Sequence, residues 1–531
     1  MKIQNKGYRV FIPLMFSIML VVGMFIGNIL PKGINQNEKI YHDRDKLGAV
    51  IDYIENEYVD SISKEDLTEK TIPYLLRKLD PHSFYIPAQN LENINEPLRG
   101  NFDGIGVRFN MHNDTLLINE VVKNGPSEKV GLLAGDRIIK VNDTIIAGVN
   151  FIDDNIVKML KGKGGTKVNV SIDRKGVEGL LDFKITRGKI PIYSVDVAYM
   201  IDEEIGYIKI INFSQSTYKE FKDALRQLKN EGLSKLILDM RDNPGGVMSG
   251  ATLIADEFLE RGKLIVYTEG KSRSRENSYA TTRDLGRDIE LVILIDEGSA
   301  SASEIIAGAI QDNDRGAIMG RRSFGKGLVQ EQTMFTDGSA LRLTIARYYT
   351  PTGRCIQKSY ENGTEDYRND LMQRYMHGEM TESDSITFED SLKFTTPGGK
   401  IVYGGGGIMP DIFVPIDTLG ISRYFTKVRR MGYIFRFALS YSDNNRNILN
   451  KFKDYKEIEE YLENQNILEK FIEFASEKGI ERDNEGIKES GFIIDTQIKA
   501  YIARNFFDNS GFYPIIRKID KTLMEAIALY N

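Results

Sequence analysis

The sequence has very little of the side-chain chemistry on which metal centres and disulfides depend. Its 531 residues include one cysteine, Cys355, four histidines and no tryptophan. A single cysteine excludes an intramolecular disulfide, a cysteine-based zinc site and an iron–sulfur cluster within one chain. Histidine pairs of the metal-binding kind are absent too, because no two of the four are close in sequence: His42, His82, His112 and His377. We therefore expect no metal or other cofactor.

The charges are nearly balanced, with 70 Lys and Arg against 76 Asp and Glu and a net charge of −6. A nucleic-acid-binding surface needs clustered basic residues, so we do not expect nucleic acid as a partner. Hydrophobic residues make up 41% of the chain, including 26 Phe and 26 Tyr, which is enough for a large core. At roughly 100–200 residues per domain, the length predicts about three domains.

One long hydrophobic run lies at the start of the chain. Lys2, Lys6 and Arg9 precede an uncharged stretch from Val10 to Pro31. About 20 apolar residues are needed to span a membrane, and a basic flank favours a cytoplasmic N-terminus. We therefore predict that residues 1–31 form a single-pass anchor in the inner membrane, with the rest of the chain periplasmic or exterior. A cleaved signal peptide and a periplasmic protein are the alternative.

The composition and hydrophobic periodicity of the remaining sequence change three times, which divides it into four segments. Residues 32–98 have apolar residues at helical spacing, and residues 99–188 are short strands and glycine turns of one small β-rich module. Residues 189–416 alternate buried strands with amphipathic helices, which predicts an α/β domain with a largely parallel sheet. Within that domain, residues 358–400 are polar and are expected to form an insertion or a mobile flap. Residues 417–531 are charged, poor in proline and periodically apolar, which predicts a helical extension.

Three motifs stand out in the α/β region, namely RDNPGG (241–246), GSASASE (298–304) and SFGKGLVQ (323–330). The first two lie between a buried strand and a helix, where α/β domains usually place their sites. A serine needs an adjacent base to become a nucleophile. The nearest histidine downstream is His377, in the polar insertion. A lysine can replace histidine when burial lowers its pKa and keeps it neutral.

In this interpretation Lys326 lies in a dry pocket beside Phe324. Gln330 would face the same side of a strand as Lys326 and could hold the amine in place. The backbone N–H of Ala302 and one from Gly245 or Gly246 could bind an oxyanion. Each motif also has a simpler explanation, as a helix cap, a solvated lysine or an ordinary turn.

Together, the three motifs resemble those of the carboxy-terminal processing proteases, the tail-specific serine peptidases of family S41. FDGIGVRF with GLLAGDRIIKVND is similar to the PDZ domain of that family, and LDPHSFYI, RYYTPTGRCIQ and GIMPDIFVP are similar to its framework. The resemblance implies a ClpP/crotonase-like core with Ser301 as nucleophile, Lys326 as general base and Gln330 as the supporting residue. Residues 358–400 and 417–531 depart from the shorter members of the family.

The PDZ resemblance has a physical counterpart in four residues. They resemble the loop whose N–H groups grip the terminal carboxylate of a peptide, which then adds a strand to the sheet edge: Gly104, Ile105, Gly106 and Val107. Apolar side chains at the peptide end would fill the pocket. The alternative is that the glycines only form a bulge. We interpret His82 and Cys355 as structural residues.

The sequence therefore predicts a serine endopeptidase that recognises unstructured C-termini and cleaves through an acyl-enzyme. Its partners would be proteins or peptides with exposed, apolar C-termini, and whether it forms a homo-oligomer is open. Two other functions are weighed against this one. The first is a non-catalytic, membrane-anchored PDZ scaffold or adaptor in the periplasm. The second is a crotonase-like acyl-CoA enzyme, suggested by the NPGG-type loop, which would bind CoA.

Overall fold

The structure is a computed structural model of the chain, and it describes residues 8–29, 45–111, 114–149, 153–386 and 390–531. Two compact units are distinguished, residues 1–74 and residues 75–531, and each is described by itself.

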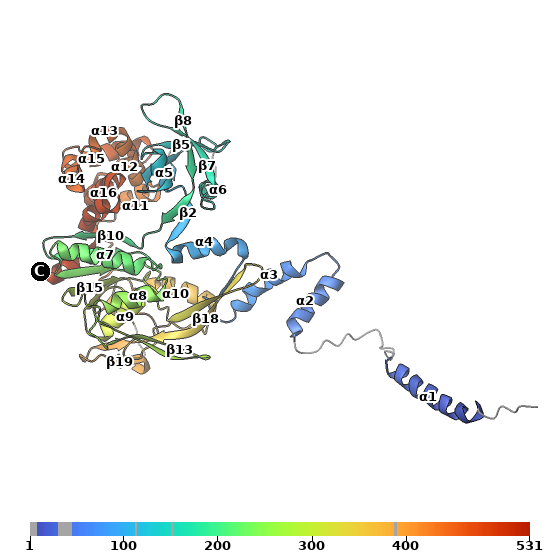
Figure 1. The fold of residues 1–531 in the computed structure, drawn as a ribbon. Helices are drawn as coiled ribbons and strands as arrows, with labels where there is room; N and C mark the ends of the chain where they lie inside the picture. The colour runs from blue at the N-terminus through green and yellow to red at the C-terminus, as the bar shows by residue number, and fades with distance from the viewer. Residues whose placement is uncertain (1–7, 30–44, 112–113, 150–152, 387–389) are drawn as a thin grey trace, which may run out of the picture. The chain divides into compact units, whose positions relative to one another are not determined.

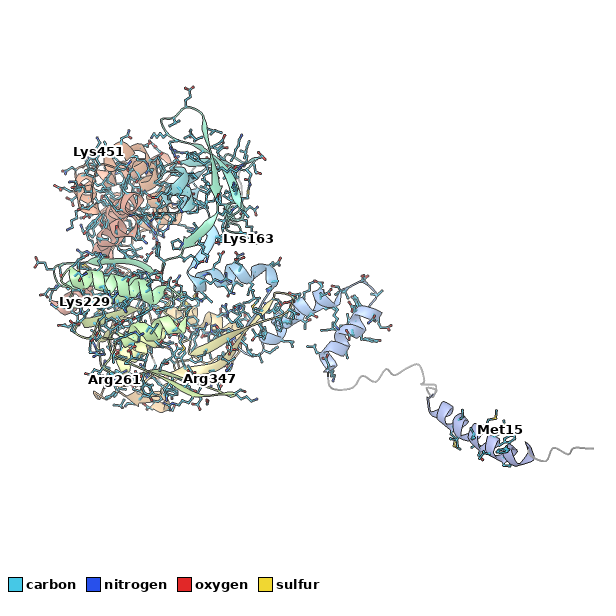
Figure 2. The ribbon with its side chains drawn as sticks, in the orientation of Figure 1. Met15, Lys163, Lys229, Arg261, Arg347 and Lys451 are labelled. Atoms are coloured by element: carbon cyan, nitrogen blue, oxygen red, sulfur yellow. The ribbon has the colours of Figure 1, made fainter. Side chains whose placement is uncertain are left out.

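The first unit consists of helices α1 (Tyr8–Ile29), α2 (Lys46–Glu57) and the greater part of α3 (Lys64–Leu76). Apolar side chains of α1 are exposed, for example that of Met15 (Figure 2). The membrane anchor predicted for residues 1–31 is not supported. Residues 1–7 and 30–31 lie outside the described residues, and no helix in the described part is both long enough and apolar enough to cross a membrane.

The centre of the second unit is a six-stranded sheet in the order β10-β11-β12-β15-β16-β21. Only the β10–β11 pair is antiparallel, and the other four pairs are parallel. The parallel arrangement confirms the predicted α/β class and explains why the strands are almost continuously apolar, since both faces of the sheet are buried. The strands are β10 (Val195–Met200), β11 (Ile205–Ile210), β12 (Lys235–Asp239), β15 (Glu290–Ile295), β16 (Ala317–Gly320) and β21 (Ile412–Phe413).

Alternate residues of the sheet pack against different helices. Leu236 and Leu238 of β12 belong to a cluster with α7 (Thr217–Asn230), α8 (Met248–Asp256) and α9 (Ala302–Asp312). Ile237, between them in sequence, packs on the opposite face with α17 (Lys521–Tyr530). This alternation follows from the period of two along a strand. The last helix of the chain, α17, therefore packs on one face of the central sheet (Figure 1).

A second sheet runs in the order β1-β18-β13-β14, with β17 paired to β18. Strand β17 begins directly after the SFGKG loop, so it carries Gln330. Its register with β18 places Gln330 opposite Thr344. The strands are β1 (Phe84–Ile86), β13 (Leu264–Gly270), β14 (Arg273–Tyr279), β17 (Leu328–Met334) and β18 (Ala340–Tyr349).

Residues 101–191 form the β-rich module. Helix α4 (Ala88–Arg99) precedes it, and a two-stranded ribbon of β2 (Asn101–Gly104) and β9 (Gly188–Pro191) joins its ends. The module has its own apolar core. Its sheet has the order β3-β4-β5-β7-β8, with β3 (Val107–Met111), β4 (Leu116–Val121), β5 (Arg137–Val141), β7 (Lys167–Asp173) and β8 (Leu180–Thr186). Helices α5 (Pro126–Val130) and α6 (Asp153–Leu160) complete it.

The polar segment predicted as an insertion or flap, residues 358–400, contains helix α10 (Thr364–Met376) and strand β19 (Lys393–Thr395), which forms a hairpin with β20 (Ile401–Tyr403) just after the segment. Helix α10 is attached to the core, because the buried Arg374 guanidinium donates to the carbonyls of Ser323 at 3.1 Å and Arg322 at 2.7 Å. These described residues therefore support the loop that leads to Lys326.

Residues 423–530 are almost entirely helical, which confirms the predicted helical extension. Six helices share one apolar cluster, and α16 is kinked where Phe507 and Asp508 leave the helical conformation. The segment returns to the core at its end, where Asp520 forms an ion pair with Arg241 at 2.6 Å. The helices are α11 (Arg423–Arg430), α12 (Tyr433–Asn444), α13 (Arg446–Leu449), α14 (Tyr455–Glu463), α15 (Ile467–Glu477) and α16 (Asn484–Ile516).

Candidate active site

One cavity of about 360 Å³ brings together residues from all three motifs. Ser301, Lys326 and Gln330 line it, although Ser301 follows β15 of the central sheet and Gln330 lies on β17 of the second sheet. Gly245 and Gly246 form part of the wall, together with Arg342 and Tyr348 of β18. The structure therefore brings together the residues that the sequence predicted for catalysis.

Ser301 lies at the turn between β15 and the N-terminus of α9. Its φ of 55° is in the left-handed region that non-glycine residues seldom occupy, and such conformations concentrate at functional sites. Gly245 approaches this turn closely. A Cβ atom on Gly245 would lie 2.6 Å from the Ala300 oxygen and 2.8 Å from the Ser301 Cβ, so only glycine fits there.

The NPGG loop has two backbone amides that could bind an oxyanion, those of Gly245 and Gly246, and the two are not equivalent. The Gly245 N–H already donates to the Asn243 side-chain oxygen at 2.9 Å. The N–H groups of Gly246 and Ala302 donate to no residue in the described part of the chain. The N–H groups of Gly246 and Ala302 are therefore available to an oxyanion. The contribution of Gly245 is its lack of a side chain, which lets the loop approach Ser301 closely.

The Lys326 amine is held by Gln330, as the sequence suggested. It donates to Gln330 Oε1 at 3.2 Å, and Gln330 Nε2 donates to the His82 carbonyl at 2.5 Å, which fixes the amide so that its oxygen faces the amine. Burial is the main cause that lowers the pKa of Lys326, and the charge of Arg342 lowers that pKa further. Glu304 and Asp80 act in the opposite direction.

No hydrogen bond joins the Ser301 hydroxyl and the Lys326 amine among the described contacts. Hydrogen bonds between catalytic groups are often long in the absence of substrate and shorten when the substrate binds. The relevant observation is therefore that the Ser301 and Lys326 side chains line the same cavity. The imidazole of His82 is not an alternative base. Burial and then the charge of Lys326 lower the pKa of His82 to about 4, and its Nε2 lies 2.7 Å from the Tyr367 hydroxyl.

Glu304 is a site residue that the sequence reasoning left without a role. Its side chain is fully buried, and its carboxylate joins the nucleophile turn to the lysine loop. Oε2 accepts from the N–H groups of Ser301 at 2.7 Å and Lys326 at 2.9 Å. Oε1 accepts from the Ser323 hydroxyl at 2.6 Å and the Gly325 N–H at 2.7 Å. Burial nevertheless raises the pKa of Glu304 to about 7.

Tyr348 forms a second link between the two loops that was not anticipated. Its hydroxyl lies 3.0 Å from the Ser301 carbonyl oxygen and 2.6 Å from that of Lys326. For Glu304 the sequence signal was its S-x-x-E spacing from Ser301, the pattern of a helix capping box that the structure contains, and for Tyr348 it was only its place in RYYTPTGRCIQ. Neither position indicates which distant loop the side chain reaches.

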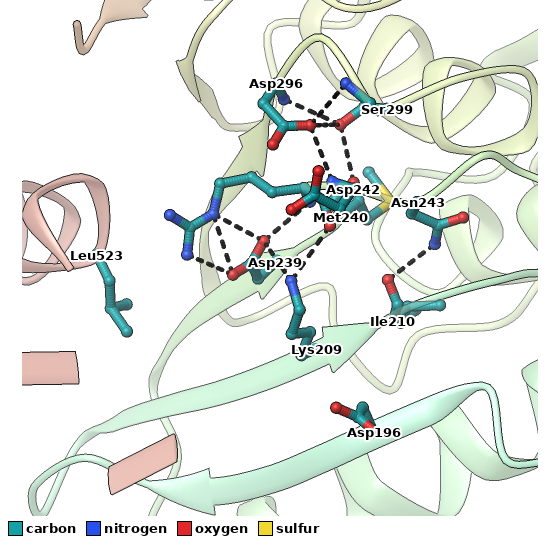
Figure 3. A network of polar contacts seen from close by, with 12 residues as sticks. Asp196, Lys209, Ile210, Asp239, Met240, Asp242, Asn243, Asp296, Ser299 and Leu523 are labelled. Carbon is teal, nitrogen blue, oxygen red and sulfur yellow. Dashed lines mark hydrogen bonds and ion pairs between the residues drawn. The ribbon is translucent and has the colours of Figure 1, made fainter. Parts of the chain in front are cut away.

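A polar network holds the NPGG loop against the nucleophile turn (Figure 3). Asp296, just after β15, accepts from the N–H groups of Asp242 at 2.8 Å and Gly298 at 3.0 Å. The Ser299 hydroxyl donates to the Met240 carbonyl at 2.8 Å, and the Asn243 amide donates to the Ile210 carbonyl at 2.8 Å. Burial raises the pKa of Asp296 to about 6. These bonds cross the carboxyl ends of three parallel strands.

The residues predicted for peptide binding lie elsewhere, in the β-rich module. Gly104 ends β2, Val107 begins β3, and Ile105 and Gly106 form the connection. The carbonyls of Ile105 and Gly106 accept from the N–H groups of Ser127 and Val122, each at 3.0 Å. The N–H groups of Ile105 and Gly106 donate to no described residue. Two buried amides are thus free to receive a carboxylate.

Three family models match the chain. Peptidase family S41 matches residues 204–366, the PDZ domain matches residues 104–185, and a family of unknown function matches residues 424–508. The first range contains Ser301 and Lys326, and the second contains the Ile105–Gly106 connection.

Curated relatives extend the likeness. The carboxy-terminal-processing protease of Bartonella bacilliformis is 34% identical over 350 residues, which are 64% of this chain and 80% of that protein. The carboxy-terminal processing protease CtpA of Bacillus subtilis is 35% identical over 315 residues, or 59% of this chain and 66% of that protein. Among solved structures, a photosystem II D1 C-terminal processing protease is 26% identical with a TM-score of 0.33, covering 59% of this chain and 90% of its own.

These relationships do not favour an inert scaffold or an acyl-CoA enzyme. A third of the residues are identical across four-fifths of the Bartonella protease, and the S41 match spans the cavity that holds Ser301 and Lys326. The chain therefore belongs to the carboxy-terminal processing proteases of peptidase family S41, and it is a serine-type peptidase that carries a PDZ domain.

Proposed function

We propose that this protease cleaves peptide bonds with a Ser301–Lys326 dyad. The observation that supports the proposal most strongly is the shared cavity, in which the lysine amine is oriented by Gln330 and has a lowered pKa. A neutral amine can accept the Ser301 proton, as an adjacent base must for serine to act as a nucleophile.

In the proposed reaction, Ser301 Oγ attacks the substrate carbonyl carbon while Lys326 takes its proton. The N–H groups of Gly246 and Ala302 stabilise the resulting oxyanion. The lysine then returns the proton to the leaving amine, and an acyl-enzyme remains. Water, deprotonated by Lys326, attacks the ester, and the lysine returns that proton to Ser301 Oγ as the new C-terminus is released. Glu304 and Tyr348 touch neither reacting group with their side chains and act as positioning residues.

The dyad is tested with Ser301→Ala and Lys326→Ala in the full chain, assayed on a peptide with an apolar C-terminus. Each change should abolish cleavage, and a fluorophosphonate should label the parent at Ser301 but not Ser301→Ala. The parent rate should rise with pH as Lys326 loses its proton. Measurable turnover by either variant would refute the dyad, and inhibition by a chelator would contradict a metal-free reaction.

We further propose that the PDZ domain captures unstructured C-termini of substrate proteins. The free amides of Ile105 and Gly106 support this role, because they can bind a terminal carboxylate. A substrate whose C-terminus is amidated lacks that carboxylate and should bind less tightly than the free acid. Equal affinity of the two forms would contradict tail capture while leaving the dyad untouched.

The extracytoplasmic location stays a prediction from the sequence of residues 1–31. It rests on the basic flank and the uncharged stretch that follows it. Fractionation of cells that produce the full chain, with protease accessibility from outside the cytoplasmic membrane, would test it.

A further inference from the structure

Strand β3 offers a free edge directly after the Ile105–Gly106 connection. It lies at the end of its sheet, pairs with β4 on one side, and has no partner strand on the other among the described residues. A peptide whose carboxylate reaches the amides of Ile105 and Gly106 can add along this edge as a strand. Successive side chains of such a peptide would point to opposite faces of the sheet.

A groove of about 440 Å³ runs along β3 between the PDZ domain and the helical extension. Four consecutive β3 residues, 107–110, line one wall, together with Asn119 and Glu120 of β4. Because consecutive strand residues face opposite sides, the groove reaches both the edge of β3 and its outer face. The other wall is formed by α12 and α16, including Tyr501 and Arg504.

Specific contacts hold the helical extension against the PDZ domain. Arg137 of β5 forms an ion pair with Asp443 of α12 at 2.6 Å, and both side chains are largely buried. A Cβ atom on Gly135 would lie 3.0 Å from the Arg446 side chain, which shows how closely the surfaces approach. The helices of residues 423–516 lie beside this part of the PDZ domain (Figure 1). The helical wall of the groove is therefore anchored.

The helical wall of the groove carries a cation, Arg504. Arg504 forms no ion pair with any described residue, and its guanidinium lies 5.2 Å from the centre of the Phe512 ring. Arg108, by contrast, is paired with Glu120 at 3.1 Å. Burial, and then the charge of Asp508, raise the pKa of Glu120 to about 7. The charges of Arg108 and Arg504 lower that pKa, so Arg504 acts on Glu120 without forming an ion pair with it and can still bind a further carboxylate.

Asn119 adds an unsatisfied hydrogen-bonding atom to the same wall. Its Oδ1 is buried and has no hydrogen-bond donor. Leaving a buried acceptor without a donor is costly, so a ligand that brings a donor is favoured at this position. A donor on a side chain that enters the groove would meet this atom.

We propose that this groove is a second wall of the tail-binding site, in which Arg504 binds an acidic side chain on the outward face of a bound C-terminal tail. The proposal rests on the tail capture proposed above. It makes the helical extension, which matches a family of unknown function, part of substrate selection. The preferred substrates would have Asp or Glu at the penultimate or the fourth-last position, since alternate residues face the groove.

The test uses the full chain carrying Ser301→Ala, so that bound peptides stay intact. Fluorescent peptides with Asp or Asn at the penultimate or the fourth-last position are compared by anisotropy, each as the free acid and as the C-terminal amide. We expect the free acids to bind about fivefold more tightly with Asp than with Asn at one of these positions, as a partly exposed charge-assisted bond would give.

Adding Arg504→Gln should reduce the Asp-to-Asn affinity ratio to about one. Arg504→Lys should retain part of the preference for Asp, and higher salt should weaken that preference. Arg436→Gln is the matched control, because Arg436 is an exposed arginine of α12 that does not line the groove. It should keep the full preference.

The outcomes separate the two proposals. Equal binding of acids and amides would refute tail capture, and this inference with it. Tighter binding of the acids with an Asp-to-Asn ratio near one at both positions would refute the groove assignment and leave tail capture intact. A fivefold ratio that survives Arg504→Gln in a protein with the parent's melting temperature would also overturn the role of Arg504.

Discussion

The carboxylate of Glu304 joins the two loops that carry Ser301 and Lys326, and its replacement by an amide tests how much that link contributes. Glu304→Gln keeps the shape of the side chain, but one of its terminal atoms becomes a donor. An NH₂ group in place of Oε2 would face two backbone N–H groups. In place of Oε1 it would face the Gly325 N–H and the Ser323 hydroxyl, which can turn and accept.

The second orientation leaves the Gly325 N–H without an acceptor, and the Ser323 hydroxyl, which already accepts from the Ile408 N–H at 2.6 Å, must find a new acceptor for its proton. One buried, unpaired donor costs about 1–3 kcal/mol. If the loop relaxes to relieve that cost, the same energy must be regained to reach the reactive geometry. The kcat should then fall about 5- to 150-fold, with little change in KM, because Glu304 does not line the cavity.

The pH dependence of folding gives an independent measure. Burial raises the pKa of Glu304 from 4.5 to about 7, because removing the carboxylate from water costs more than its four hydrogen bonds return. The stability it contributes is fully present below pH 4.5 and is lost as the pH rises through 7, by about 3 kcal/mol in total. Glu304→Gln does not titrate, so its free energy of unfolding should lack this decline.

The assay combines steady-state kinetics on a fluorogenic peptide with denaturant unfolding at several pH values. Glu297→Gln is the control, since Glu297 is a nearby carboxylate that pairs with Arg321 and does not line the cavity. It should retain kcat within about twofold, as expected for a partly exposed ion pair. A folded Glu304→Gln protein with the parent's kcat and the parent's pH dependence would refute the positioning role.

Two further predictions concern the cavity wall. Arg342→Gln should move the acidic limb of the kcat/KM profile to higher pH, because the Arg342 charge lowers the pKa of Lys326. Arg342→Lys keeps the charge and should hold the limb in place; an unmoved limb in Arg342→Gln would contradict the electrostatic argument. Gly245→Ala should reduce fluorophosphonate labelling of Ser301 by about 100-fold or more, because its Cβ would collide with the serine turn. Gly262→Ala, at a similar φ of 84° but with open space around it, controls for backbone strain, and equal labelling of both variants would refute the collision.

Much of the catalytic centre could be predicted because its signals are local. Ser301 and Lys326 lie in short glycine- and serine-rich loops, and Gln330 follows Lys326 at strand spacing. Because the chain has only four histidines and none close to the serine run, the sequence itself indicates a lysine as the base. The α/β class was equally accessible, because buried parallel strands require the nearly continuous apolar runs seen in β12 and β15.

The roles of other residues depend on contacts that no local pattern encodes. Of the two NPGG amides, the fold engages that of Gly245 with Asn243 and leaves that of Gly246 free. Glu304 acts on a loop about twenty residues away, and its usual interpretation from sequence would be a helix-capping residue.

The sequence by itself determined which reactive side chains this protein has: a serine and a lysine in glycine-rich loops, a single cysteine that excludes an intramolecular disulfide, and four scattered histidines. It also determined which segments form strands and helices. These properties follow from residue identity and short-range periodicity. Only the tertiary structure decided which groups meet, such as β3 of the PDZ domain and Arg504, nearly 400 residues later in the chain. Such contacts between distant segments result from the burial of apolar surface across the whole chain. That burial depends on all segments together, so no single motif predicts it.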